Sequence, residues 1–99
     1  MVQTNYIQER DELEIVFKEV DVPEIIKTDD GITFEFDSEN LSAIILPYFG
    51  QMIYRQLPHI EDLSEASIIF EDLTLELLKL KINDRNINVK INLKDLENS

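Results

Sequence analysis

Acidic side chains crowd the segment from Thr28 to Ser42, TDDGITFEFDSENLS, where they surround three bulky apolar residues. Carboxylates spaced in this way could hold a calcium ion, or a pair of them could work as general acid and general base. Both kinds of site require the carboxylates to converge. The five side chains in question are Asp29, Asp30, Glu35, Asp37 and Glu39.

A calcium loop of the EF-hand type needs oxygen ligands at alternate positions around a central glycine. If Gly31 were that glycine, Ile26 would have to be a ligand, and if Asp37 were the first ligand, Ser42 would replace the glycine. Residues 30 and 37 also flank an expected strand, which separates them by about 23 Å at roughly 3.3 Å per residue. We therefore predict no metal site and no cofactor.

Catalytic arrangements find little support in the rest of the sequence. Glu35 and Asp37 have the separation of a glycosidase pair, but alternation along any solvent-facing strand produces the same spacing. His59 is the only histidine, it follows Pro58 at an expected helix end, and no serine lies in a nucleophile-elbow sequence. With two glycines in the chain, a glycine-rich phosphate loop is also excluded. We expect no catalytic residue and a protein that is not an enzyme.

Composition narrows the possible partners. The formal net charge of −12 opposes binding to nucleic acid and to anionic membranes, because both require lysine and arginine. The chain has no cysteine and no apolar run of membrane-spanning length, and its first residues are polar and acidic. We expect a cytoplasmic protein, and a basic protein remains a possible partner.

The charge is unevenly distributed along the chain. Residues 9–39 contain twelve acidic and three basic side chains, whereas residues 73–99 contain four acidic and five basic ones. The two parts could attract each other within one chain or between two chains. Alternatively, both are ordinary solvated surfaces whose charges salt would screen.

Alternating apolar and polar residues predict several strands. The alternation is clear over 13–17, 32–36 and 87–93. Residues 24–27 are typical of a further short strand, and turn residues lie at 29–31, 37–40 and 83–86. The segment 29–41 also aligns without gaps on 84–96, either through duplication or because amphipathic hairpins resemble one another.

Residues 62–82 fit two patterns. One apolar stripe has helical spacing, whereas shorter stretches alternate like strands. We favour a helical turn at 62–66 followed by strands, because 78–82 needs an antiparallel partner in 87–93.

The segment from Leu41 to Ile60 has a single formal charge, on Arg55. We expect a buried strand over 42–46 and a helix over 48–57, which starts after Pro47, ends at Pro58 and is weakened by Gly50. The segment is either plain core or partly an interface, since it is rich in residue types that favour interfaces. The candidate interface residues are Ile45, Tyr48, Phe49, Met52, Tyr54 and Arg55.

Together these patterns predict a single small α+β domain over residues 12–96. It would contain an antiparallel sheet of about five or six strands with one helix packed on one face, a flexible tail at 1–11 and a C-terminal tail at 97–99. We expect a non-enzymatic protein–protein interaction module that forms a homodimer through 43–55. The alternative is an inhibitor, antitoxin or immunity-type protein whose acidic surface covers a basic surface on another protein.

Overall fold

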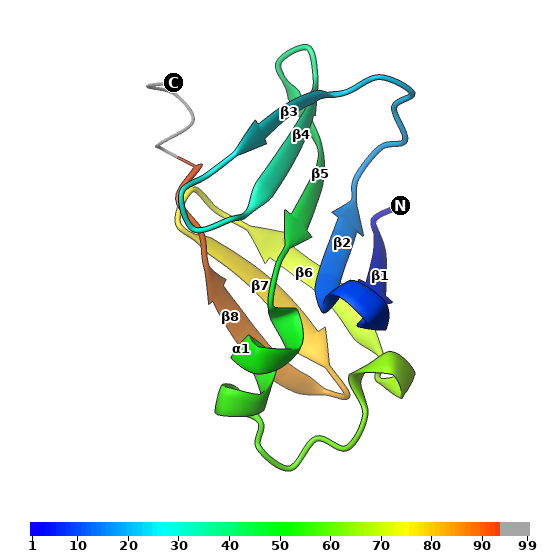
Figure 1. The fold of residues 1–99 in the computed structure, drawn as a ribbon, viewed down its shortest axis with the longest axis vertical. Coiled ribbons are helices and arrows are strands. Elements are labelled where there is room, and N and C mark those ends of the chain that lie inside the picture. Colours follow the sequence, from blue (N-terminus) through cyan, green and yellow to red (C-terminus); the bar gives the residue numbers. More distant parts are fainter. Residues whose placement is uncertain (94–99) are drawn as a thin grey trace. The chain divides into compact units, whose positions relative to one another are not determined.

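The computed structural model describes residues 1–93 and divides the chain into two compact units, residues 1–65 and 66–99. We call them the N-terminal unit and the C-terminal unit. Each unit contains one antiparallel sheet, of five strands in the first and three in the second (Figure 1). The predicted α+β class with antiparallel pairing and one α-helix is confirmed. The strands belong to two sheets, however, of five and three strands, whereas we expected one sheet of about five or six. The C-terminal tail at 97–99 and the end of the 84–96 segment lie outside the described residues.

The N-terminal unit holds the five-stranded sheet, and every neighbouring pair in it is antiparallel. Strands β3, β4 and β5 follow one another as a meander, β1 and β2 form a hairpin, and β2 pairs with β5. The sheet order is therefore β1-β2-β5-β4-β3. The strands are β1 (Gln3–Ile7), β2 (Glu12–Val16), β3 (Glu24–Lys27), β4 (Thr33–Asp37) and β5 (Asn40–Leu46).

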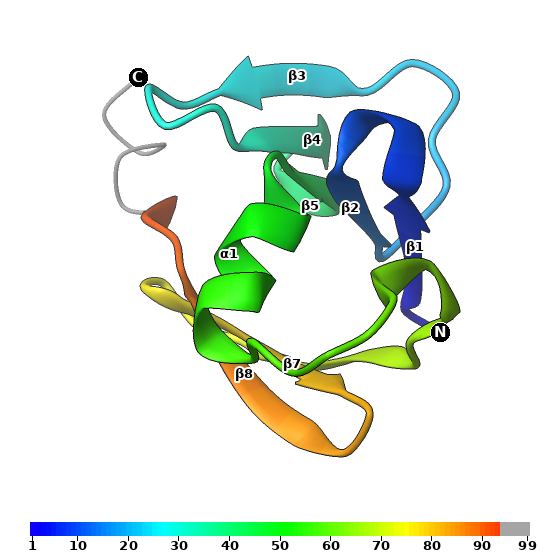
Figure 2. The ribbon, with the colours of Figure 1, turned by 60° about the horizontal axis from the view of Figure 1, so that its bottom comes forward.

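One face of this sheet is apolar and buried. Strand alternation places the side chains of β2, β4 and β5 on it, and these are at most 1% exposed: Leu13, Ile15, Phe34, Ile44 and Leu46. Helix α1 (Phe49–Gln56) lies on the same face (Figure 2). Phe49 approaches Tyr6 of β1 with a ring-centroid distance of 6.0 Å. The predicted helix over 48–57 is thus confirmed to within one residue at each end.

The first strand corrects one prediction. We expected a flexible tail over residues 1–11, whereas β1 pairs along its whole length with β2 and a short 3₁₀ helix, η1 (Gln8–Arg10), joins the two. Gln3 and Asn5 of this strand are exposed, whereas Thr4 and Tyr6 are half-buried. Thr4 lies opposite Ile15 of β2, and Tyr6 lies opposite Leu13. Because it contains few apolar residues, its alternation is weak in the sequence.

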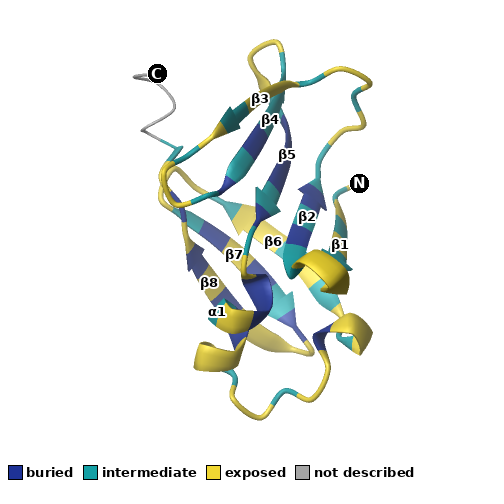
Figure 3. Ribbon diagram, in the orientation of Figure 1, coloured by how far each residue is buried: buried dark blue, intermediate teal, exposed yellow. Residues whose placement is uncertain are grey.

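The C-terminal unit contains a three-stranded meander in the order β6-β7-β8. Its strands are β6 (Ile68–Leu73), β7 (Leu77–Ile82) and β8 (Arg85–Lys90), and the 3₁₀ helix η2 (Leu63–Glu65) precedes them in the chain. Our preferred interpretation of 62–82, a helical turn followed by strands, is confirmed. Figure 3 shows the alternation of buried and exposed residues along β7 and β8.

The turns in the aligned segments 29–41 and 84–96 do not have matching backbone conformations. Gly31 has a positive φ of 88°, but its aligned counterpart, Asn86, lies inside β8. The positive φ values of the β7–β8 turn belong instead to Asn83 and Asp84, at 48° and 70°. This pair of positive φ angles is typical of a tight two-residue hairpin turn.

Helix α1 is capped by a residue far from it in sequence. The residue before it, Tyr48, has a left-handed φ of 53° and makes no side-chain cap. Asp11 supplies the cap, because its carbonyl oxygen accepts the Phe49 N–H at 2.9 Å and its Oδ1 accepts the Gly50 N–H at 2.6 Å. Tyr6 donates its hydroxyl to the same Oδ1 at 2.6 Å. Two N–H groups that would otherwise lack partners at the helix start are thereby satisfied.

Gly50 is required by this cap rather than being a defect of the helix. A Cβ at this position would lie 2.6 Å from Asp11 Oδ1 and 3.2 Å from the Tyr6 hydroxyl. The carboxylate would have to move, and it would then lose its hydrogen bonds. Glycine lowers helix stability by about 1 kcal/mol relative to alanine. At this position it also allows the Asp11 carboxylate to approach the helix backbone closely.

We predict that the effect of Gly50→Ala changes sign with residue 11. In the wild-type chain the substitution should lower the free energy of unfolding by about 1–2 kcal/mol, because it disrupts the partly buried hydrogen bonds to Asp11 Oδ1. In an Asp11→Gly background it should raise the free energy by about 0.5–1 kcal/mol, through helix propensity alone. Urea unfolding of the four proteins measures both values. Equal effects in the two backgrounds would contradict the proposed cap.

A second prediction concerns pH. Burial, followed by the hydrogen bond to Asp11, raises the pKa of Tyr6 above its ordinary value of 10.0. The unfolded chain therefore releases this proton at lower pH than the folded chain, so the contribution of Tyr6 to stability is complete below about pH 10 and declines above it. Urea unfolding between neutral and alkaline pH should show a steeper decline for the wild type than for Tyr6→Phe. Parallel pH profiles would refute this assignment.

Candidate functional site

The five carboxylates expected to form an acidic surface are spread over the length of one strand. Asp29 and Asp30 lie exposed in the β3–β4 connection, and Glu39 lies exposed in the β4–β5 turn, at the other end of β4 (Figure 1). Within residues 1–93, no group of three or more acidic, histidine or cysteine side chains could hold a metal ion. The two ends of β4 are thus separate acidic positions.

Two of these carboxylates already have partners. Asp37 accepts a hydrogen bond from Lys18 Nζ at 2.6 Å, and this pair also counts as an ion pair. The Thr28 hydroxyl donates to Asp30. Of the five, only Glu35 lies in the middle of a strand, β4.

Glu35 lies on what we call the outer face, the side of the five-stranded sheet opposite the buried one. Across the strands, the register gives one row running from Ile25 through Glu35 and Ala43 to Val16. The next row contains Lys27, Thr33, Ile45 and Glu14. The outer face therefore mixes aliphatic side chains with two carboxylates. It brings Ile45, from the expected interface, into the same surface as Glu35, from the expected acidic set.

The expected interface residues do not form one patch. Phe49 is fully buried, so including it as a contact residue was wrong: its ring is needed against Tyr6. Met52 and Ile45 are half-buried, and Ile45 belongs to the outer face. Tyr48, Tyr54 and Arg55 remain exposed, with Tyr48 at 64% and Tyr54 at 42%.

Sequence reasoning missed the exposed edge at β3. This strand ends the sheet, and most of it is exposed (Figure 3). Ile25 is 65% exposed and Val22, just before the strand, is 88% exposed. Pro23 and Lys27 were the available signals, because proline and lysine are typical of edge strands.

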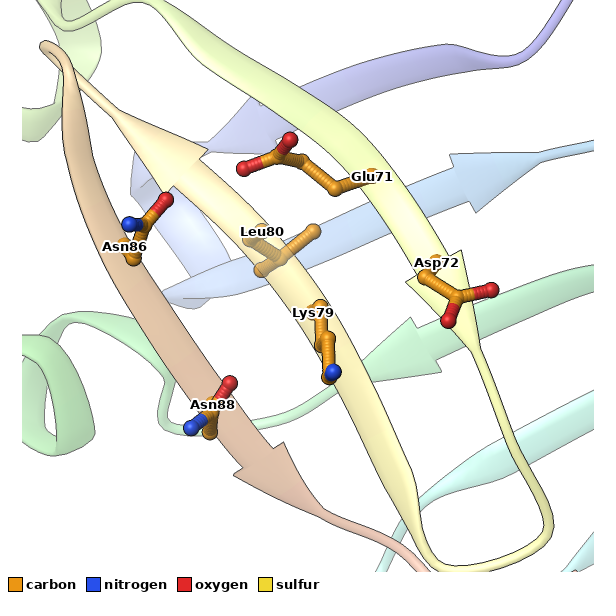
Figure 4. Close-up of a pocket in the computed structure, with 6 residues that line it drawn as sticks. All are labelled: Glu71, Asp72, Lys79, Leu80, Asn86 and Asn88. Carbon is orange, nitrogen blue, oxygen red and sulfur yellow. The ribbon is translucent and has the colours of Figure 1, made fainter.

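A shallow hollow of about 460 Å³ lies on the three-stranded sheet. It is lined by Glu71, Asp72, Lys79, Leu80, Asn86 and Asn88, from all three strands (Figure 4). Glu71 is the extra residue of an irregularity in the β6–β7 pairing. The polar lining residues are all exposed, and their two carboxylates and one lysine leave a formal charge of −1. The hollow thus offers neither a buried polar anchor nor a strong local charge.

One buried polar atom lacks a partner among the described residues, the Oγ of Ser42 in β5. Ser42 is 2% exposed, and its carbonyl oxygen accepts the N–H groups of both Phe17 and Lys18, at 2.8 and 3.1 Å. The residue is an extra one in the β4–β5 pairing, between the pairs Glu35–Ala43 and Phe36–Leu41. Its backbone therefore shapes the sheet, and its hydroxyl is too enclosed to meet a ligand.

Comparisons with known proteins assign no family to the chain: no family model, no curated protein and no solved structure matches it. No helix among the described residues is long and apolar enough to cross a membrane.

Proposed function

We propose that this chain is a non-enzymatic protein–protein interaction module that covers a basic surface of another protein. The observation that carries the proposal is the charge of the N-terminal unit. Residues 1–65 contain fifteen acidic and four basic side chains, a net charge of −11, whereas residues 66–99 have a net charge of −1. The cysteine-free composition also leads us to propose the cytoplasm as its compartment.

Most of this negative charge is available to a partner. The ion pairs between described residues are Arg10 with Glu12 and Lys18 with Asp37, and both lie at exposed positions. Such pairs contribute little stability and exchange readily with other charges. Residues 21–30 alone contain four exposed carboxylates and a single lysine. A surface of this kind attracts a basic protein and speeds the encounter with it.

The binding experiment uses oligolysine of about ten residues and isothermal titration calorimetry. Binding at low salt should weaken as ionic strength rises, because screening shortens the reach of exposed charges. The double substitution Asp29→Asn with Asp30→Asn should weaken binding about twofold to fivefold. The matched control, Glu71→Gln with Asp72→Asn, removes the same charge from the other unit and should have a smaller effect. Equal losses, or no binding at low salt, would reject the proposal.

A second candidate function is self-association through the exposed part of 43–55. The observation in its favour is the exposure of two aromatic residues, Tyr48 just before α1 and Tyr54 within it, together with that of Arg55. These residue types are enriched where proteins meet.

Light scattering over a wide range of protein concentration tests this candidate. A dimer that the double substitution Tyr48→Gly with Tyr54→Ser converts to monomer would support it. Glycine suits the left-handed backbone at position 48, so the variant should keep its fold, which circular dichroism checks. A wild-type chain that stays monomeric at about 100 μM would exclude a physiologically useful dimer, whose dissociation constant would lie well below that value.

A further inference from the structure

The free edge of β3 has the features of a binding position for an extended segment. Strand β3 pairs with β4 on one side, and within residues 1–93 no strand pairs with its other side. An unpaired edge presents backbone donors and acceptors that another extended chain can use.

The pairing identifies which backbone groups are open. The Thr28 N–H donates to the Ile32 carbonyl at 2.9 Å, so the backbone groups of Thr28 point toward β4. Successive residues of an antiparallel strand alternate in this direction. With the register Ile26–Phe34, the N–H and C=O groups of Ile26 also face β4, and those of Ile25 and Lys27 face the open edge.

The side chains around this edge indicate the chemistry of the occupant. Ile25 offers an exposed apolar side chain on the outer face, with the exposed Val22 before it. Carboxylates lie at both ends of the strand, on Asp21 before it and on Asp29 and Asp30 after it, and all three are exposed. Lys27 is the single cation, and lysine on an edge strand discourages indiscriminate pairing.

We propose that the edge of β3 binds an extended basic segment of the partner protein by strand addition. This inference rests on the proposed function and specifies how the partner is held. The backbone of the segment pairs with Ile25 and Lys27, an apolar side chain of the segment lies beside Ile25, and its flanking cations lie near the terminal carboxylates. A second copy of this chain is disfavoured at this edge because the same carboxylates would face each other.

Two substitutions of Lys27 separate strand addition from attraction between charges alone. Both Lys27→Ala and Lys27→Pro remove the positive charge, which should strengthen binding of any basic probe. Only Lys27→Pro also removes the N–H that faces the open edge, and an edge strand tolerates proline where the N–H points outward. The probe is a peptide of about nine residues that alternates lysine and valine, a strand-forming pattern.

We expect Lys27→Ala to bind this peptide more tightly than wild type and Lys27→Pro to bind it at least about tenfold more weakly than Lys27→Ala. Urea unfolding of both variants checks that they fold. A peptide of the same sequence with alternate backbone amides methylated should bind the wild-type chain about tenfold more weakly, since it cannot pair along the edge. This second measurement remains decisive if Lys27→Pro does not fold.

The possible results distinguish the two proposals. Equal tightening by both substitutions, or equal affinity for the methylated and unmethylated peptides, overturns strand addition while leaving the acidic surface as the binding site. Failure of both this peptide and oligolysine to bind the wild-type chain overturns both proposals. A wild-type dimer that Lys27→Pro abolishes would show that a second copy occupies the edge, and it would also overturn the inference.

Discussion

The start of helix α1 depends on one carboxylate. Asp11 lies 39 positions before Gly50, yet it accepts hydrogen bonds from the backbone of the helix and from the hydroxyl of Tyr6. Through these contacts, the turn between β1 and β2 is joined to the junction between β5 and α1. The left-handed backbone at Tyr48 and the missing side chain at Gly50 both serve this junction, and Phe49 is held against Tyr6 as a result.

The position of the negative charges in the N-terminal unit follows from which side chains occupy the buried face of its sheet. The buried face is occupied by aliphatic and aromatic side chains, so carboxylates remain only at strand ends, in turns and on the outer face. Strand β3 is the last in the order and is preceded and followed by such turns. An open backbone edge and a concentration of negative charge therefore occur together. A partner that recognises both must be extended and basic.

Local patterns predicted most of the elements, and long-range pairing determined what they missed. Alternation identified β2 and β4, and the prolines at 47 and 58 bracketed α1, because these signals act over a few residues. Strand β1 was not predicted, because its stability comes from pairing with β2 and from the Tyr6–Asp11 hydrogen bond. The contact of Phe49 with Tyr6 likewise joins residues far apart in the sequence, and no neighbouring residue encodes it. The edge position of β3 did have local signals, Pro23 and Lys27. Alternation does place Ile45 and Ile44 on opposite faces of the sheet. The prediction of a single interface over 43–55 did not take this into account.

The strand order also affects the route by which the chain folds. Strand β5 is synthesised last of the five but lies at the centre, between β2 and β4. Hairpins β1–β2 and β3–β4 can form while the chain is still emerging, since each needs only local contacts. Their inner edges stay unpaired until residues 40–46 arrive and join them. The ribosome thus releases two open half-sheets before it releases the strand that closes them, and this interval is when misassembly is most probable.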